Sequence, residues 1–395
     1  MRGRGWLATG LAGVVGVAAV GAVLWARVPA PPPAAAPSSA AGRAEASLAA
    51  LLYAFRMSWG GLSTHPGRGG HHGVLSTAGP TAVWGYTWAL AAAEDVAQIP
   101  GAPPSARATV RSLANGLALY WDARAKTPAY APYPFAGPRT TKYFDDNAWA
   151  GLDLVGAYRL TGDRAFLAQA EKVLRYERTG WDPSGGGIYW NDKRRTRQTP
   201  SNPPVAELAA YLYEETHQRS ELRFAERIYA WEVSTLVDQR TGQVWDNIDA
   251  SGHVVRSLWT YNLGTVIGAG ALLYHITGRA SYLAQAEQTA AFTLTHAVRA
   301  NGILLPQAEF NGVLADNLQL LNQVRPNPAI ARLIAANAAS AWSRARTHSD
   351  LFARDWSGPP PTAGSVTLLQ QTGAVRVLAV AAVLARGRGF GGFAL

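Results

Sequence analysis

Two adjacent carboxylates, Asp145 and Asp146, are the side chains of this sequence best suited to chemistry. Neighbouring residues have Cα atoms ~3.8 Å apart, so two such carboxyl groups can lie ~5–5.5 Å apart across one small site. That separation suits a double displacement at a sugar carbon, in which one carboxylate attacks and the other acid protonates the departing oxygen. Two like charges so close also separate their pKa values, which keeps one acid protonated while the other is ionised. A pair that only caps a helix is the alternative.

The residues around the pair favour the chemical interpretation. They form the aromatic segment 142–149, Lys-Tyr-Phe-Asp-Asp-Asn-Ala-Trp. A helix that begins here carries both acids in its first turn, where free backbone N–H groups and the helix dipole favour negative charge. Trp149 follows one turn later, on a nearby face of the same helix. We therefore expect the acids at the start of a helix that opens into a cleft.

Segment 143–149 resembles the acidic motif of glycoside hydrolase family 76, the bacterial and fungal endo-α-1,6-mannanases. Three further stretches are similar to that family and occur in the same order: Trp-Gly-Tyr-Thr-Trp at 84–88, Gly-Gly-Gly-Ile-Tyr-Trp at 185–190 and Trp-Thr-Tyr-Asn-Leu-Gly at 259–264. The resemblance covers about residues 45 to 385. Two departures from the family pattern are Leu263, where many relatives carry Gln, and the segment 203–204, which replaces a Glu-containing one.

The resemblance implies a retaining hydrolase of α-1,6-linked mannan, with Asp145 as nucleophile and Asp146 as general acid and then base. It implies a mannose-rich glycan as the binding partner and no metal or cofactor. The residues alone leave the order of the two roles open, except that the less solvated acid should hold the proton. Two alternatives remain: a transglycosylase that transfers mannan or a mannose-containing anchor to an acceptor, and a non-catalytic glycan-binding protein on the same scaffold.

Sugar-binding candidates follow from aromatic and polar residues near the motifs. Indole rings stack on the C–H faces of sugars, and the chain has 14 tryptophans, although packing between helices is the alternative for each of them. For two of the acids, capping of a turn is an equally good explanation. The predicted substrate-binding residues are Trp84, Asn147, Trp149, Tyr189, Trp190, Asn202, Trp245, Asp246, Asp249, Tyr261 and Asn262, of which Asp246 and Asp249 are the two acids in question.

Composition excludes several other classes of protein. The chain has no cysteine, so disulfides and thiolate metal sites are excluded, and its eight histidines show no metal-binding spacing. The net charge of +10 comes from scattered arginines, a pattern that does not predict a nucleic-acid partner. We expect a monomer.

The N-terminus predicts export. Arg2 and Arg4 precede an uncharged run from Gly5 to Ala26, long enough to cross a ~30 Å hydrocarbon core as a helix. Residues 1–26 are therefore expected to be a signal peptide or an uncleaved anchor, residues 27–44 a Pro/Ala-rich linker, and residues 45–395 the catalytic domain. Both alternatives place that domain outside the cytoplasm, as in a secreted or membrane-anchored bacterial protein.

From residue 45 onward the pattern predicts an all-α protein. Twelve helices in sequential hairpins suit an (α/α)6 barrel of six inner and six outer helices, and a stacked α-solenoid is the alternative. The expected helices are 45–58, 79–98, 104–125, 143–161, 163–179, 202–217, 220–238, 260–277, 279–299, 312–324, 327–347 and 363–385.

An internal repeat supports the barrel. The stretch 158–171 matches the stretch 274–287 at an offset of 116 residues, which equals two hairpins of 58 residues each. The same offset places Asp145 and Asp146 on Tyr261 and Asn262, so inner helices should begin with polar or aromatic groups at one end of the barrel. Short β-hairpins at 187–190 and 242–255 should form the rim of that end.

Overall fold

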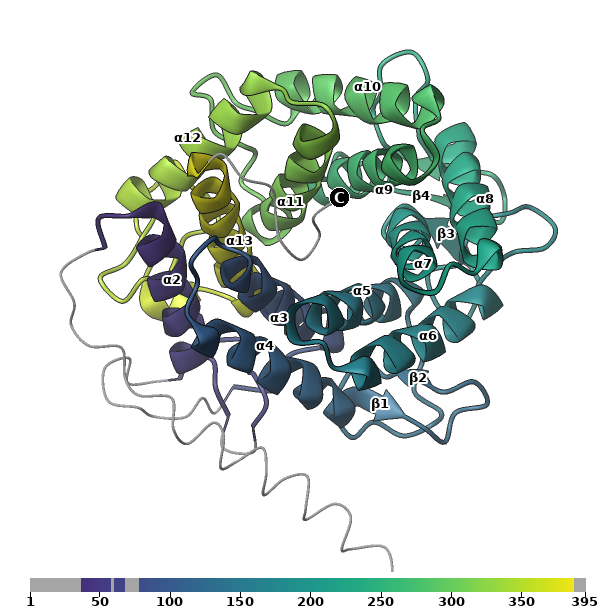
Figure 1. The fold of residues 1–395 in the computed structure, drawn as a ribbon, viewed down its shortest axis with the longest axis horizontal. Helices are drawn as coiled ribbons and strands as arrows, with labels where there is room; N and C mark the ends of the chain where they lie inside the picture. The colour runs from purple at the N-terminus through teal and green to yellow at the C-terminus, as the bar shows by residue number, and fades with distance from the viewer. Residues whose placement is uncertain (1–36, 58–59, 68–77, 387–395) are drawn as a thin grey trace, which may run out of the picture.

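The computed structural model describes residues 37–57, 60–67 and 78–386, and this part of the chain contains twelve α-helices (Figure 1). All twelve match expected helices. They are α2 (Ala40–Ala54), α3 (Val83–Ala97), α4 (Pro104–Gly116), α5 (Phe144–Thr161), α6 (Arg164–Thr179), α7 (Asn202–Thr216), α8 (Arg219–Leu236), α9 (Thr260–Thr277), α10 (Ala280–His296), α11 (Ala308–Val324), α12 (Pro328–Arg344) and α13 (Leu368–Ala385).

Helices α3, α5, α7, α9, α11 and α13 contact one another in a closed ring, and the other six lie outside it (Figure 1). The last inner helix, α13, packs against the first, α3. Closure of the ring excludes the open solenoid and confirms the (α/α)6 barrel.

Burial distinguishes the two rings of helices. The inner helix α9 is buried without interruption from Thr260 to Leu273, so its sequence shows no polar face. The outer helix α6 buries one stripe at helical spacing, which includes Phe166, Ala170 and Val173, and leaves its opposite face open to solvent. The inner ring therefore forms the core, and the outer ring shields it from solvent.

The repeat is confirmed by the helix boundaries. Helices α5, α7 and α9 begin at Phe144, Asn202 and Thr260, each 58 residues after the one before. Helices α5 and α9 also end alike, at Gly162 and Gly278, which adopt the left-handed φ values of 72° and 69° that suit glycine. The first turns of these three helices consequently lie at the same end of the barrel.

Several expected boundaries were wrong. The helix expected over 104–125 ends at Gly116, and the chain continues as the 3-10 turn η1 (Leu117–Tyr120) and the hairpin of β1 (Trp121–Asp122) and β2 (Ala129–Tyr130). A side chain at Gly116 would collide with the buried Tyr86 hydroxyl.

The first and the last helix of the chain also begin at residues other than the expected ones. Helix α2 begins at Ala40, within the expected linker, because the Ser39 side chain accepts a hydrogen bond from the Gly42 N–H at 3.0 Å. Helix α13 begins only at Leu368, since Thr367 and Gln370 form a capping box, and the preceding segment holds the 3-10 turn η2 (Ala363–Ser365).

The two expected hairpins merge into one sheet. Strands β3 (Thr196–Gln198), β4 (Asn247–Asp249) and β5 (Val254–Val255) pair antiparallel in that order. Tyr189 forms a bridge with Arg197 and so joins the glycine-rich segment 185–190 to the same sheet. One sheet therefore carries both insertions along the rim.

The expected anchor at 1–26 and all but the end of the linker lie outside the described residues. Within the described part of the chain, α13 is long and apolar enough to cross a membrane, but 72% of it is buried. Because α13 belongs to the inner ring, its apolar character is explained by the barrel core.

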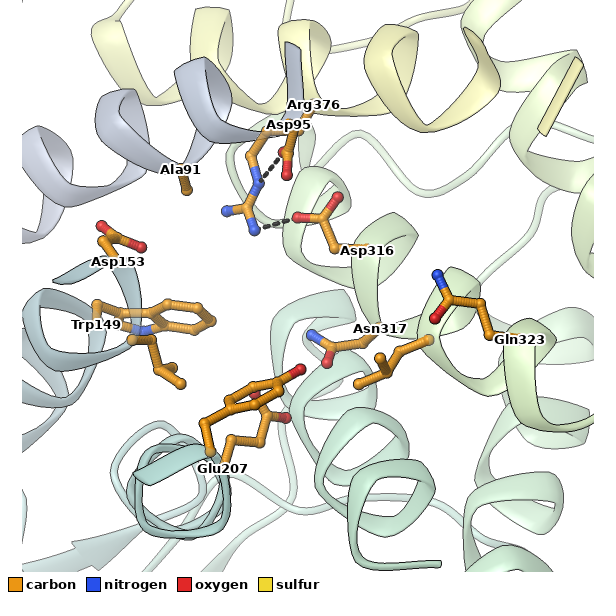
Figure 2. Close-up of a pocket in the computed structure, with 12 residues that line it drawn as sticks. Ala91, Asp95, Trp149, Asp153, Glu207, Asp316, Asn317, Gln323 and Arg376 are labelled. Carbon is orange, nitrogen blue, oxygen red and sulfur yellow. Dashed lines mark ion pairs between the residues drawn. The ribbon is translucent and has the colours of Figure 1, made fainter. Parts of the chain in front are cut away.

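A charged cluster fills the middle of the barrel. Arg376 on α13 is 5% exposed and forms ion pairs with Asp95 and Asp316, while Asp153 lies across the same cavity (Figure 2). Burial, followed by the charge of Asp316, raises the pKa of Asp95 well above its usual value, and burial leaves the pKa of Asp316 at about 6 despite Arg376. The single positive charge of Arg376 thus determines how many of these acids are ionised.

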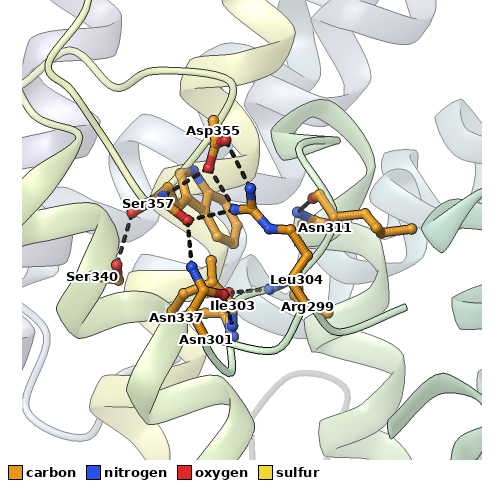
Figure 3. A network of polar contacts seen from close by, with 11 residues as sticks. Arg299, Asn301, Ile303, Leu304, Asn311, Asn337, Ser340, Asp355 and Ser357 are labelled. Carbon is orange, nitrogen blue, oxygen red and sulfur yellow. Dashed lines mark hydrogen bonds and ion pairs between the residues drawn. The ribbon is translucent and has the colours of Figure 1, made fainter. Parts of the chain in front are cut away.

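A second polar network connects the loops that precede α11 and α13 (Figure 3). Both terminal nitrogens of Arg299 donate to Asp355, at 2.9 and 2.6 Å, and Arg299 and Asn301 both donate to the Ser357 hydroxyl. Ser340 donates to the Trp356 carbonyl at 2.8 Å. These contacts fasten the last two hairpins of the barrel to each other.

Replacing Arg376 by Met should lower the free energy of unfolding by about 3–5 kcal/mol at pH 7.5, because Asp95 and Asp316 remain buried without a counter-charge. The loss, measured by urea denaturation, should shrink towards pH 5, since protonation of Asp316 then removes its buried charge. Arg325→Met is the control. It breaks an exposed ion pair with Glu287 (66% and 46% exposed side chains) and should cost less than about 1 kcal/mol. Equal losses in both variants would contradict the role of Arg376.

Candidate active site

Asp145 and Asp146 are the second and third residues of α5, in the first turn of an inner helix as expected. Asp146 is only 8% exposed, whereas Asp145 is half-buried. The free N–H groups of this helix end can stabilise a negative charge on either carboxyl. Any difference between the pKa values of the two acids must therefore come from their other neighbours.

Asp145 is the acid whose charge is stabilised. The Trp190 indole N–H donates to its Oδ2 at 3.2 Å. Burial raises the pKa of Asp145, but the backbone N–H groups of Asp146 and Asp145 and the Trp190 indole oppose that rise, and the pKa is about 6. Asp145 is therefore mainly ionised at neutral pH.

Asp146 is the acid that holds the proton. Burial and then the neighbouring charge of Asp145 raise its pKa well above the usual value, and no hydrogen bond that would stabilise its ionised form opposes them. At neutral pH the pair thus holds one carboxylate at Asp145 and one carboxylic acid at Asp146. The less solvated acid carries the proton, as physical reasoning from the sequence required.

The glycine-rich segment 185–190 determines the position of Trp190. Gly186 and Gly187 adopt the left-handed φ values of 71° and 81° and lie against Trp231, where side chains would collide. The Phe144 N–H then donates to the Trp190 carbonyl at 2.9 Å, and the Trp190 ring packs on Tyr143 at 5.0 Å between centroids. With 36% of its surface exposed, Trp190 keeps a face free beside Asp145.

Beneath the acids lies an aromatic layer. The Trp149 indole donates to the Tyr261 hydroxyl at 2.7 Å, and that hydroxyl donates to the Pro200 carbonyl at 3.0 Å. Both rings contact Trp88, which in turn contacts the half-buried Trp84 at 5.2 Å. Trp149 and Tyr261 are only 5% and 6% exposed, so they support the site from below, while Trp84 keeps a partly open ring.

Trp149 also lines the deeper cavity of Figure 2. Neither Asp145 nor Asp146 belongs to the lining of that cavity. Along α5, Trp149 stands between the acid pair and Asp153 of the charged cluster, so the aromatic layer separates the two.

Two asparagine side chains fix the carboxylate of Asp246 beside the sheet. The Asn262 side chain donates to one of its oxygens at 3.1 Å and the Asn247 side chain to the other at 2.8 Å. Asn262 is fully buried and positions Asp246 through this bond, while the direct sugar contact expected at Asn262 stays a prediction. Trp245 beside it is half-buried, with the Arg256 guanidinium over its ring at 4.6 Å.

Two predicted sugar ligands have a structural role instead. Asn147 is fully buried; it accepts from the Tyr130 N–H at 2.7 Å and donates to the Tyr130 and Tyr143 carbonyls. Asn202 does the same for Ile188, whose N–H and carbonyl it binds at 2.6 and 3.1 Å. Their amides are thus bonded to backbone in this structure, and a contact of either residue with substrate stays a prediction.

Two further predicted ligands, Asp249 and Tyr189, take part in local hydrogen bonds. Asp249 caps its own turn by accepting from the Ser251 and His253 N–H groups, the alternative that the sequence left open. Tyr189 forms the bridge with Arg197, and its hydroxyl donates to Asp182. Both residues thus stabilise the rim of the site, and their contact with sugar stays a prediction.

Sequence reasoning missed Glu177. This residue is fully buried on α6, neither carboxyl oxygen has a hydrogen-bond partner among the described residues, and burial followed by the charges of Asp145 and Asp146 raises its pKa well above the usual value. The available signal was its position on the apolar stripe of the helix, four residues after Val173. Among the described residues, no group of three or more His, Asp or Glu side chains is arranged to hold a metal ion.

Comparison with known proteins gives the same family from three directions. The model of glycosyl hydrolase family 76 matches residues 51–387. A family 76 mannosidase from Bacteroides thetaiotaomicron has a TM-score of 0.78 at 25% identity, over 88% of this chain and 99% of the other. The α-1,6-mannanase of Salegentibacter sp. HEL1_6 has a TM-score of 0.75 at 25% identity, over 88% and 100%.

Curated relatives match over shorter stretches. The mannan endo-1,6-alpha-mannosidase DCW1 of Candida glabrata is 29% identical over 195 residues, 44% of this chain and 42% of that protein. DFG5 of Saccharomyces cerevisiae, with the same described activity, is 28% identical over 151 residues, 34% of this chain and 33% of the yeast protein. The matches thus span less than half the length of these relatives. With the family model matched over most of the sequence and an (α/α)6 barrel around an Asp-Asp pair, the chain belongs to glycosyl hydrolase family 76.

Proposed function

We propose that this protein is a retaining glycoside hydrolase that cleaves α-1,6-mannosidic linkages in mannan-type polysaccharide. The observation that carries the proposal is the asymmetry of the acid pair. Asp145 is ionised and held by Trp190, while Asp146 beside it is kept neutral by burial and by the charge of Asp145. Nucleophile and proton donor are thus both in the required protonation state at neutral pH.

The first step forms a covalent intermediate. A carboxylate oxygen of Asp145 attacks the anomeric carbon of the mannosyl unit, and the bond from that carbon to the leaving oxygen breaks. Asp146 gives its proton to the leaving oxygen, so the released chain departs as an alcohol. Loss of negative charge on Asp145 removes the repulsion that had kept Asp146 protonated, so the pKa of Asp146 falls as it gives up its proton.

The second step releases the sugar. Asp146, now a carboxylate, takes a proton from a water molecule that attacks the anomeric carbon, and the ester bond to Asp145 breaks. Two inversions leave the product with the α configuration of the substrate. Both acids return to their starting protonation states.

The relatives are α-1,6-mannanases and mannan endo-1,6-alpha-mannosidases by name, which supports mannan as substrate. We also propose that the domain works outside the cytoplasm, secreted or held at a membrane by the N-terminal segment, and that it is a monomer. A transglycosylase uses the same first step and differs only in the acceptor of the second. A non-catalytic glycan-binding role is disfavoured, because that role does not need one acid charged and its neighbour neutral.

Incubation of the protein with linear α-1,6-mannan should release shorter mannan fragments whose reducing ends increase with time. Size-exclusion chromatography of the products measures the cleavage. Adding an acceptor such as mannobiose separates the two activities, because a hydrolase leaves the acceptor unchanged while a transglycosylase elongates it. Absence of cleavage and of transfer would contradict the proposal.

Asp145→Asn removes the nucleophile without a change of shape, so kcat should fall by roughly three or more orders of magnitude. Asp146→Asn should impair polymer far more than an activated aryl mannoside, whose leaving group needs little protonation. With azide, Asp146→Ala should give the α-mannosyl azide, because azide attacks the covalent intermediate. Asp145→Ala should give the inverted β product, and NMR of the azides distinguishes them. The opposite stereochemistry would show that the two roles are exchanged.

The pH profile should report on Trp190. In the wild type, kcat/KM should fall below pH 6 as Asp145 takes up a proton. Trp190→Phe keeps a ring but removes the indole N–H, so the pKa of Asp145 should rise and the acidic limb should move upward by about one pH unit. Trp245→Phe is the control, because its indole does not bind Asp145; it should leave the limb in place whatever its effect on KM. An unchanged limb in Trp190→Phe would exclude this role for the indole.

A further inference from the structure

A buried carboxyl group beside the site has a hydrogen-bond pattern that requires a proton. Glu232 is fully buried on α8, the outer helix that lies next to β3 and β4 (Figure 1). Its Oε1 lies 2.7 Å from the Thr199 hydroxyl oxygen, and its Oε2 has no hydrogen-bond partner among the described residues. Glu232 takes no part in the double displacement at the acid pair.

The Thr199 hydroxyl lies between two oxygen atoms. Besides Glu232, it contacts the Trp245 carbonyl oxygen at 2.6 Å. A hydroxyl has one proton to donate, and a carbonyl oxygen can only accept. The Thr199 proton must therefore point to Trp245, because two oxygens at this distance repel each other unless a proton lies between them. The contact with Glu232 is then a hydrogen bond only if Glu232 donates, which requires the neutral carboxylic acid.

The surroundings of Glu232 favour this neutral form. Burial raises its pKa most, the bond to Thr199 opposes the rise, and the negative charge of Asp246 adds to it, so that the pKa is about 8. An acid is neutral below its pKa and ionised above it. Glu232 therefore keeps its proton at neutral pH and loses it as the pH rises through about 8.

No cation near Glu232 stabilises its ionised form. Tyr229, one turn earlier on α8, is the other titratable group that interacts with it. Arg197 and Arg256 lie over tryptophan rings at 5.7 and 4.6 Å, and neither contributes to the pKa of Glu232. The helices packed against α8, which are α7 and α9, contribute no charge to that pKa either.

The bond from Glu232 fixes the backbone that carries two predicted sugar ligands. The Thr199 N–H donates to the Asp246 carbonyl at 2.9 Å, while the Thr199 hydroxyl donates to Trp245. The Trp245 N–H donates to the carbonyl of Leu236, the last residue of α8, at 2.8 Å. Both polar backbone groups of Trp245 are therefore held from α8, one directly and one through Glu232 and Thr199.

The same segment supports the aromatic layer beneath the acids. The carbonyl of Pro200, the residue after Thr199, accepts a hydrogen bond from the Tyr261 hydroxyl at 3.0 Å, and that hydroxyl accepts one from the Trp149 indole at 2.7 Å. Trp149 lies one turn after the acid pair on α5. Hydrogen bonds and one peptide unit thus connect α8 with the helix that carries the acids.

Building on the proposed function, we propose that Glu232 is a positioning residue that works as a neutral acid: its proton holds Thr199, and Thr199 holds Trp245 and Asp246 where they bind sugar. When Glu232 gives its proton to solvent, its carboxylate accepts the Thr199 hydroxyl, and the Trp245 carbonyl loses its donor. An unpaired buried carbonyl is costly, so the segment that carries Trp245 moves to pair it elsewhere. Substrate binding is therefore strong only while Glu232 is protonated.

This switch is separable from the titration of the acid pair. Loss of the Asp146 proton removes the general acid and lowers kcat. Loss of the Glu232 proton displaces sugar ligands and leaves the acids in place, so it raises KM. Kinetics at alkaline pH can thus distinguish the two groups.

The test measures KM for linear α-1,6-mannan on the full chain at several pH values. In the wild type, KM should rise about tenfold above about pH 8, the effect of one lost hydrogen bond at a buried carbonyl. In Glu232→Gln the side-chain amide donates to Thr199 at every pH, so KM should stay within about twofold of its neutral value. Thr199→Val keeps the shape but breaks the link, so KM should already be raised at neutral pH and should not change with pH.

Glu221→Gln is the matched control. Glu221 lies on the same helix, is 6% exposed and also accepts a hydrogen bond from a threonine, Thr216, but it belongs to the first turn of α8, at the end away from the sheet. This variant should show the same rise in KM as the wild type. A rise that persists in Glu232→Gln, or one that Glu221→Gln abolishes, would overturn the proposal.

Hydrogen exchange gives a readout that needs no substrate. At about pH 9 the backbone N–H groups of segment 237–256 should exchange faster in the wild type than in Glu232→Gln, whereas at about pH 6.5 the two proteins should agree. Equal exchange at both pH values would contradict the role of Glu232. A wild-type protein that cleaves no mannan at any pH would instead contradict the proposed function, and the exchange experiment would still test the switch.

Discussion

Six inner helices are buried on every side, so each polar group that they carry must find a partner or a proton inside the barrel. The cluster around Arg376 meets this constraint in its most extreme form: one guanidinium pairs with Asp95 and Asp316, and burial favours the neutral form of Asp153. A buried charge without a partner would cost far more free energy than the ion pair contributes. The cluster is therefore required for the fold to form, but its presence is weak evidence that it adds stability.

The same cost of burying a charge determines the protonation states of the acid pair. Asp145 and Asp146 are neighbours at the start of α5, but only Asp145 is half-exposed and accepts a hydrogen bond from an indole. Burial therefore raises the pKa of Asp146 further, and Asp146 keeps the proton. The chemistry needs one charged and one neutral acid, and the barrel supplies that difference through solvation. A more open site would leave both acids ionised at neutral pH.

Amide side chains in the first turns of inner helices hold the rim. Asn147 on α5, Asn202 on α7 and Gln371 on α13 each bind the backbone of the loop that precedes their helix. Because a loop over a buried barrel end would otherwise leave N–H and C=O groups unsatisfied, these amides determine where the loops can run. The loop tied by Asn147 leads to α5, and the one tied by Asn202 leads to Trp190. The same hydrogen bonds thus satisfy buried backbone groups and position the loops around the site.

The sequence by itself determined the helix pattern, the 58-residue repeat and the acid pair, because helical periodicity, glycine stops and an Asp-Asp motif are local signals. It also indicated which end of the barrel bears the site, since Asp145 and Tyr261 begin equivalent helices. It did not determine the partners of the buried polar residues: Asn147 and Asn202 bind backbone, and the buried Glu177, whose pKa the acid pair raises, was missed. Only the tertiary structure decided these, together with the two protonation states, because side-chain direction, solvation and the partner of each carboxyl depend on segments far apart in the chain, such as Trp190 beside Asp145.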